Sequence, residues 1–182
     1  MAYPTYIEHP SKIMIRYSGL FDFDGLYSVM VGWLKSRGYW FHEHTYKHKV
    51  PSPYGAEQEI GWRGEKEVTD YYKFIVTVSF HLWDITEVEV EKAGEKKKLT
   101  NARMEIILRC AVEIDYEKRF AKSTFWKFVS DWYHKYILRR TIENVWVDTV
   151  YHRLYNLQNV IKEYLDMEAK GNEYEGYMGD NV

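Results

Sequence analysis

The sequence predicts an α+β fold. We expect a single, mainly antiparallel sheet of about five or six strands, with an N-terminal helix and a long or broken C-terminal helix on one face. Residues 72–82 and 103–115 alternate between apolar and polar side chains, which is typical of antiparallel strands with one face packed and one in water. Residues 123–167 contain no proline or glycine, and their apolar residues recur at helical spacing.

Length and composition indicate one globular domain. The chain has 182 residues, of which 46% are hydrophobic and 29% charged, and a chain of this size normally buries one core. We predict a single α+β domain over residues 1–168. Residues 169–182 are polar and glycine-rich without a packing period, so we predict a flexible C-terminal tail there.

Charge and targeting signals limit the partners and the location. The net charge is −2, so there is no overall basic field and nucleic acid is not an expected partner. No apolar run approaches the roughly 20 residues of a membrane-spanning helix. The N-terminus resembles no secretory signal, and the single Cys110 cannot form an internal disulfide, so we expect a cytoplasmic protein.

The first two elements are a strand and a helix. Residues 12–19 alternate and end at Gly19, which predicts a strand. Residues 22–38 place apolar side chains three and four apart. Asp22 or Asp24 can cap the start of this helix and Gly38 is well placed to end it.

Four further strand segments follow from a period of two. They begin at Tyr39, continue past the turn sequence at residues 51–55 through Ile60 and Trp62, and then fill residues 71–116. In the first of them one face should carry Trp40, His42, His44, Tyr46 and His48, and the other should carry Phe41, Glu43, Thr45, Lys47 and Lys49.

The C-terminal helical segment has an interrupted apolar stripe. Its first half presents Phe125, Val129, Trp132 and Tyr136, and its second half presents apolar residues from Val147 to Tyr164. Between the halves the stripe passes through Arg140 and Glu143. We therefore expect either a break with Thr141 as a cap or a solvated middle.

In the order of its elements the chain resembles the helix-grip family. In that arrangement a curved sheet wraps a long final helix and often encloses an apolar ligand. The family usually has two short helices after its first strand, where this sequence predicts one. The resemblance implies a small-molecule carrier as one possible function.

The segment from Tyr39 to Lys49 is rich in histidine and aromatic residues. On a strand face His42 and His44 lie about 7 Å apart and can hold one borderline metal ion such as zinc, if His81, Glu105 or Glu113 supplies a third ligand. Alternatively Trp40, His42, His44 and Tyr46 line a small-molecule cavity. A half-exposed strand with hydrogen-bonded histidines explains the same pattern.

Other reactive patterns are weak. Glu57 with Glu59, and Glu87 with its neighbours, place carboxylates on shared strand faces, where charged rows mainly discourage edge-to-edge pairing. Phosphate-loop, dinucleotide, serine-nucleophile and zinc-protease motifs are missing from the sequence. We therefore expect no cofactor and no nucleophilic catalysis.

Aromatic residues are in excess over residues 123–167, on more than one helix face. Large amphipathic side chains of this kind are enriched at protein interfaces. The leading hypothesis is a non-enzymatic interaction or assembly protein that forms a homo-oligomer or joins a larger complex; a carrier and, third, a metal-dependent enzyme centred on His42 and His44 are the alternatives. A helix buried deeply in its own core explains the aromatics equally well. The predicted partner-binding residues are Trp126, Trp132, Tyr133, Trp146, Tyr151 and Tyr155.

Overall fold

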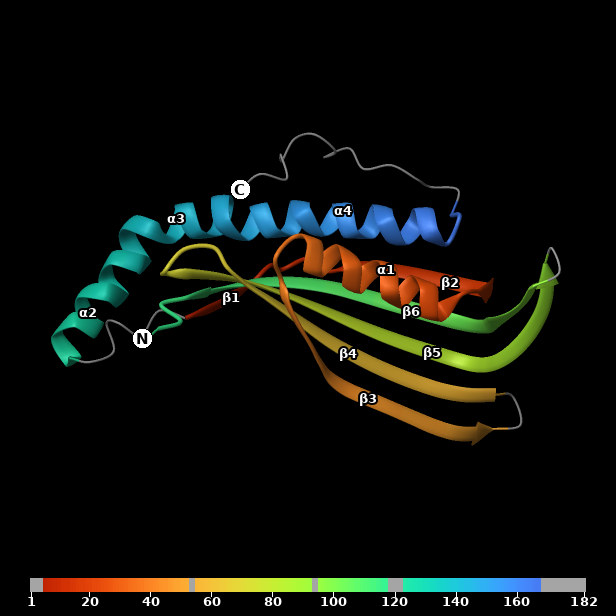
Figure 1. Ribbon diagram of the computed structural model, residues 1–182. Coiled ribbons are helices and arrows are strands. Elements are labelled where there is room, and N and C mark those ends of the chain that lie inside the picture. Colours follow the sequence, from red (N-terminus) through yellow and green to blue (C-terminus); the bar gives the residue numbers. More distant parts are fainter. Residues whose placement is uncertain (1–4, 53–54, 93–94, 118–122, 168–182) are drawn as a thin grey trace.

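One antiparallel sheet carries the fold, and helices lie along one of its faces (Figure 1). The computed structural model describes residues 5–52, 55–92, 95–117 and 123–167, so the predicted tail at 169–182 lies outside the described residues. The strands are β1 (Tyr6–Glu8), β2 (Ile13–Phe21), β3 (Trp40–Ser52), β4 (Gly55–Glu67), β5 (Tyr72–Lys92) and β6 (Glu95–Ile114). The helical elements are α1 (Phe23–Ser36), α2 (Thr124–Tyr133), η2 (His134–Leu138), α3 (Arg139–Thr141), η3 (Ile142–Val147) and α4 (Asp148–Tyr164).

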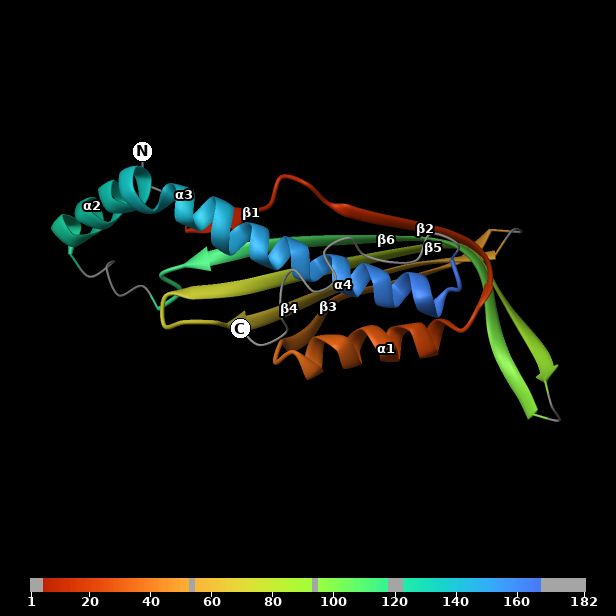
Figure 2. The same cartoon turned by 90° about the horizontal axis from the view of Figure 1, so that it is seen from above.

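The strand order is β1-β6-β5-β4-β3, and β2 also pairs with β6. All of these pairs are antiparallel. Strands β3 to β6 are therefore the predicted meander, and α1 and α4 lie over the same face of it (Figures 1 and 2). The α+β prediction is confirmed.

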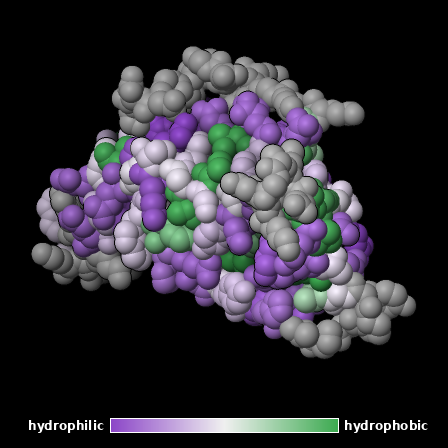
Figure 3. Space-filling view, turned by 45° about the vertical axis from the view of Figure 1, so that its right-hand side comes forward, coloured by the Kyte–Doolittle hydropathy of each residue, from purple (hydrophilic) through white to green (hydrophobic). Residues whose placement is uncertain are grey.

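The face of the sheet under the helices is apolar, and we call it the dry face. Alternate residues of β5 and β6 supply it, as their period of two predicts, and each is no more than 2% exposed. The opposite, wet face carries cross-strand ion pairs such as Arg16 to Glu105 at 2.7 Å. In the view of Figure 3 apolar side chains form patches among hydrophilic ones. The dry-face residues of these two strands are Phe74, Val76, Val78, Phe80, Leu82, Met104, Ile106, Leu108, Cys110, Val112 and Ile114.

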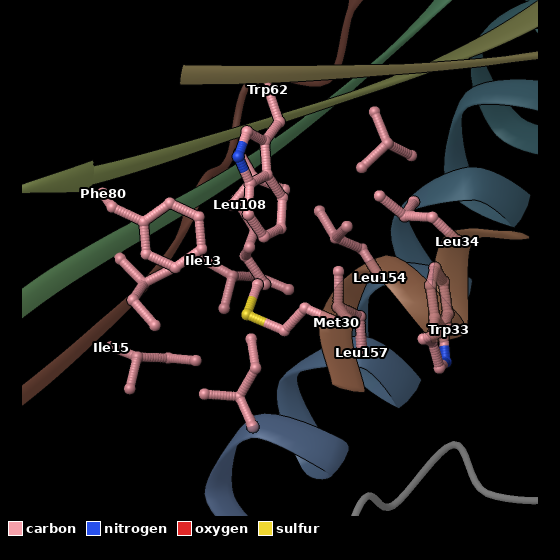
Figure 4. Packing of buried hydrophobic residues seen from close by; sticks show 14 of the residues in the cluster. Ile13, Ile15, Met30, Trp33, Leu34, Trp62, Phe80, Leu108, Leu154 and Leu157 are labelled. Carbon is pink, nitrogen blue, oxygen red and sulfur yellow. The ribbon is translucent and has the colours of Figure 1, made fainter. Parts of the chain in front are cut away.

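The space between helices and sheet is filled around Trp62. Trp62 projects from β4 into this space and is fully buried, with ring centroids 4.4 Å from Tyr27 and 4.6 Å from Phe80. Met30 of α1 and Leu154 of α4 reach the same cluster (Figure 4). A cavity of about 470 Å³ remains between the N-terminal end of α1 and the sheet.

A β-bulge in β3 corrects the predicted faces of this strand. The pairing of β3 with β4 shifts register between Glu43 and Thr45. Before the shift Glu43 is the residue opposite Trp62, and after it Tyr46 is opposite Ile60, so both face the helices. A bulge inserts one unpaired residue and exchanges the faces beyond it. The prediction that Trp40, His42, His44 and Tyr46 share one face is therefore wrong.

The C-terminal segment is one bent helix with two π-helical turns, η2 and η3. Thr141 has helical dihedral angles, φ −67° and ψ −39°, so of the two predicted alternatives the break with a cap at Thr141 is wrong. The other alternative, a solvated middle, agrees with the exposure of Arg139, Arg140 and Thr141. Each π turn adds a residue and rotates the following apolar stripe. The buried residues Ile142 and Val147 are accordingly five apart, whereas Val147, Val150 and Leu154 are three and four apart. At this bend α2 turns away from α4 and lies beyond the ends of the strands (Figures 1 and 2).

We predict that the core around Trp62 contributes much of the stability. Trp62→Ala should lower the free energy of unfolding by about 3–5 kcal/mol, because it removes a buried indole and leaves a cavity. Trp40→Ala is the matched control: this indole is 65% exposed, so its removal should change the value by less than about 1 kcal/mol. Urea unfolding measures both. Equal losses in the two variants would contradict the described packing.

Candidate functional site

The helical residues 124–138, which we call the aromatic arm, expose a broad apolar surface. Phe125, Phe128, Trp132 and Tyr136 are spaced three or four apart and are 67%, 70%, 51% and 66% exposed. Residues at this spacing form one stripe on a helix. The arm therefore presents a ridge of four aromatic side chains to the outside.

A groove runs beside this ridge. Trp126, Tyr133 and Ile137 lie about a quarter turn around the helix from the ridge, and each is roughly half exposed. Trp126 and Tyr133 line a cavity of about 330 Å³ together with Tyr71, Val129, Ser130, His134 and Leu138. Ridge and groove are adjacent and both mainly apolar, so they form one continuous surface.

A buried histidine holds the arm against Tyr71, in the turn between β4 and β5. His134 is 5% exposed and its ring stacks on Tyr71, with centroids 5.6 Å apart. Nδ1 of His134 lies 2.6 Å from the carbonyl oxygen of Ser130, so Nδ1 carries the proton and Nε2 accepts from the Tyr71 hydroxyl. Burial raises the pKa of Tyr71 to about 12, which keeps this hydroxyl protonated as the donor.

The six predicted partner-binding residues divide into two groups. Trp126, Trp132 and Tyr133 belong to the exposed surface of the arm. The other three are partly buried and pack against the chain's own core. The prediction omitted Phe125, Phe128 and Tyr136, although their spacing with Trp132 was a sequence signal that could have identified them. In the packed group Trp146 stacks on Tyr72 at 4.7 Å, Tyr151 stacks on His9 at 3.7 Å, and Tyr155 donates to the hydroxyl of Tyr151 at 3.2 Å.

The four residues of β3 that were predicted to line a cavity do not line one together. Trp40 and His42 stack on each other on the wet face, with centroids 5.6 Å apart. His44 occupies the bulge, where the absence of a side chain on Gly61 leaves room for its ring. Tyr46 alone of the four lines a cavity of about 470 Å³, at the N-terminal end of α1.

A different set of residues forms the metal-like cluster. Among the described residues, Glu57, Glu59 and His81 are the group of three whose possible ligand atoms lie close enough to share an ion. Neither His42 nor His44 belongs to it, whereas His81 was one of the three residues proposed as a third ligand.

The carboxylates of this cluster already have cationic partners. Glu57 contacts His81 Nε2 at 2.6 Å through one oxygen and Lys49 at 3.5 Å through the other. Glu59 contacts Lys47 at 3.3 Å and Lys49 at 3.6 Å. All four oxygens are thus engaged, and a metal ion would have to displace two ammonium groups. The cluster is an ion-pair row on the wet face of the sheet.

These contacts lower the pKa of both carboxyl groups. The hydrogen bond from His81 lowers the pKa of Glu57, and the hydrogen bond from Lys47 lowers the pKa of Glu59. A carboxyl group with a lowered folded-state pKa adds stability above its unfolded pKa, and this contribution is lost as the pH falls through the folded value. The contribution is small because both groups lie at the surface.

The thiol of Cys110 is unsuited to nucleophilic chemistry. It lies on the dry face of β6 and is 2% exposed. Burial raises its pKa to about 12, so the reactive thiolate is scarce at neutral pH.

The ion-pair row makes a test by NMR possible. In His81→Asn the pKa of Glu57 should rise toward its ordinary value, because the hydrogen bond from His81 that mainly lowers it is removed. The pKa of Glu59 should change less, since it is lowered mainly by the hydrogen bond from Lys47, which the substitution leaves in place. Carboxyl carbon shifts followed through a pH titration measure both. An unchanged pKa of Glu57 in His81→Asn would show that the contact with His81 does not persist in solution.

No protein-family model matches the chain, and no curated protein matches it. None of the described helices is both long enough and apolar enough to span a membrane. Function is therefore inferred from the surfaces and cavities of the molecule itself.

Proposed function

We propose that this chain is a non-enzymatic assembly protein that joins a second copy of itself through the aromatic arm. The observation that carries the proposal is the ridge of Phe125, Phe128, Trp132 and Tyr136, four large side chains that are each at least 51% exposed. Leaving such groups in water costs free energy, and monomeric proteins rarely expose them contiguously.

The area of the arm matches what a stable dimer needs. Seven large side chains of the ridge and groove are about half exposed. Since an aromatic side chain of this kind brings roughly 150–250 Å², the arm offers about 600–1,000 Å². A standard protein interface buries about 800 Å² on each partner. The arm is thus large enough to serve as a complete interface. The seven residues are Phe125, Trp126, Phe128, Trp132, Tyr133, Tyr136 and Ile137.

The shape of the arm favours a second copy over an unrelated partner. Ridge and groove lie side by side on one helix, so two antiparallel arms related by a twofold axis can each place a ridge in the other's groove. Such an interface uses the same patch twice, as most homodimers do. The α2 helix also lies beyond the strand ends (Figure 2), where a second copy can approach it without meeting the sheet.

The two alternative functions have less support. An apolar carrier of helix-grip type needs a hollow interior, and the volume around Trp62 is filled (Figure 4). A metal-dependent enzyme centred on His42 and His44 needs a third ligand, and these residues lie outside the one cluster found among the described residues. A cytoplasmic location is part of the proposal, because the single buried Cys110 requires no oxidising compartment.

Light scattering after size exclusion tests the assembly. The wild-type chain of 22.0 kDa should run at twice its mass. Phe128→Ser combined with Trp132→Ser should raise the dissociation constant at least about 100-fold, because truncation of an interface aromatic costs about 2 kcal/mol or more. The matched control, Trp40→Ser with Tyr46→Ser, removes two aromatics that are 65% and 60% exposed on β3 and should remain dimeric.

Two outcomes would overturn the proposal. One is a wild-type chain that stays monomeric at about 100 μM, a concentration at which even a weak specific dimer forms. The other is wild-type binding to vesicles with an anionic surface that the double substitution abolishes. The exposed Lys135, Arg139 and Arg140 on the same helical segment make a lipid surface the competing partner.

A further inference from the structure

The cavity at the N-terminal end of α1 lies at the opposite end of the sheet from the aromatic arm (Figure 1). Its volume is about 470 Å³. The buried residues Ile60 and Leu82, on the dry face of β4 and β5, form the floor, and Phe23 and Tyr27 of α1 cover it. The cavity therefore has the size and the apolar walls of a small-molecule site.

A bend in the hairpin of β5 and β6 closes one end of the cavity. Asp84 has φ +56°, and the register of β5 against β6 shifts next to it. A bulge of this kind bends a strand and exchanges its faces. Ile85 and Glu87 therefore line the same cavity as Leu82, which precedes the bulge. Beyond the bulge the hairpin curves toward the side of the helices (Figure 1).

The bulge in β3 brings a carboxylate and an aromatic ring to a second wall. Glu43 precedes this bulge and Tyr46 follows it, and both line the cavity. In a regular strand two residues three apart would point to opposite faces. The inserted residue is thus what places this acid and this ring on one wall.

Tyr27 holds the carboxylate of Glu43 through one of its two oxygens. The Tyr27 hydroxyl donates to Oε2 of Glu43 at 2.7 Å. Burial and this hydrogen bond raise the pKa of Tyr27 to about 12, so the hydroxyl stays a donor at neutral pH. Oε1 of Glu43 has no hydrogen-bond or ion-pair partner among the described residues. Because this carboxylate is partly buried, a cation in the cavity would stabilise it.

The ring of Tyr46 also lacks a partner. It is 60% exposed, and within the described part of the chain it makes no hydrogen bond, ring stack or cation–π contact. The face of a phenol ring attracts a cation that lies within about 6 Å of its centroid. Tyr46 therefore adds a second group on this wall that favours positive charge.

The charges around the cavity are mainly negative. Its lining contains four carboxylates, one lysine and one histidine. Lys98 pairs with Glu87 at 3.9 Å, and Asp22 caps α1 by accepting from a backbone amide at 2.9 Å. The N-terminal end of α1 contributes only about half a positive charge. This cannot also balance Glu43 and Asp24.

The arrangement of these carboxylates favours an organic cation over a metal ion. A metal ion needs several ligand atoms close together. Within the described ranges such a group of three is formed by Glu57, Glu59 and His81 on the wet face, and not by residues of this cavity. The cavity instead combines separated negative charges with aromatic and aliphatic walls.

We propose that this cavity binds a small organic amine in its protonated form. The ammonium group donates to Oε1 of Glu43 and lies against the ring of Tyr46. The apolar body of the amine packs on Ile60 and Leu82. This site shares no residue with the aromatic arm, so it goes beyond the proposed assembly function and does not depend on it.

An NMR titration of the full chain with 2-phenylethylamine at neutral pH tests the site. At about 0.15 M ionic strength, where surface charges are screened, we expect saturable amide shifts around Tyr27, Glu43 and Tyr46. The dissociation constant should be at or below about 1 mM. The neutral analogue 2-phenylethanol has the same body without the charge and should bind at least about tenfold more weakly, because a charge-assisted hydrogen bond is lost.

Three variants assign the binding to named groups. Glu43→Gln should weaken binding of the amine at least about tenfold, since it removes the charge and keeps an oxygen acceptor for Tyr27. Glu89→Gln is the matched control: this carboxylate is exposed on β5 outside the lining, so binding should change less than about twofold. Tyr46→Leu leaves the charges unchanged and should weaken binding at least about threefold.

Any of three results would contradict the amine site. The first is the absence of saturable shifts in the wild type up to about 10 mM amine. The second is equal affinity of the wild type for the amine and for 2-phenylethanol, a comparison that needs no variant. The third is the same affinity for the amine in Glu43→Gln and Glu89→Gln, which would indicate general attraction to an acidic surface or none.

Discussion

Burial of one face of the sheet under α1 and α4 is the constraint on which the rest of the structure depends. The dry-face residues of β5 and β6 are almost completely removed from water, and Trp62 links them to Met30 and Leu154 of the helices. Burial of apolar surface is the dominant favourable term in folding. The interior is filled around Trp62, and cavities lined by described residues lie at the N-terminal end of α1 and beside the aromatic arm.

The aromatic arm is a consequence of this arrangement. The helical segment from Thr124 to Tyr164 rises 1.5 Å per residue and measures about 60 Å along its axis. Its α4 part lies over the sheet, whereas α2 lies beyond the strand ends (Figure 1). The contact of His134 with Tyr71 secures the junction. The aromatic residues before it have no sheet to cover, and in the proposed dimer a second copy buries them.

Much of the fold could be predicted from the sequence, because the alternation in β5 and β6 and the spacing in α1 follow directly from burial of one face. Two features could not be predicted, and each inserts a residue that interrupts a regular pattern: the alternation of faces in a strand or the spacing of a helix. The bulge in β3 moves Tyr46 to the dry face, and the π turns place Ile142 and Val147 in one buried stripe. Neither insertion has a composition signal.

Native-state hydrogen exchange measured at several protein concentrations tests the central claim most directly. Amides of β5, β6 and α4 should exchange only through global unfolding at every concentration. Amides of residues 125–133 should exchange quickly in dilute protein and become protected as the concentration rises, because the proposed dimer buries the arm. Strong protection of residues 125–133 at the lowest concentration would contradict the account, since the chain itself would then cover the aromatic ridge.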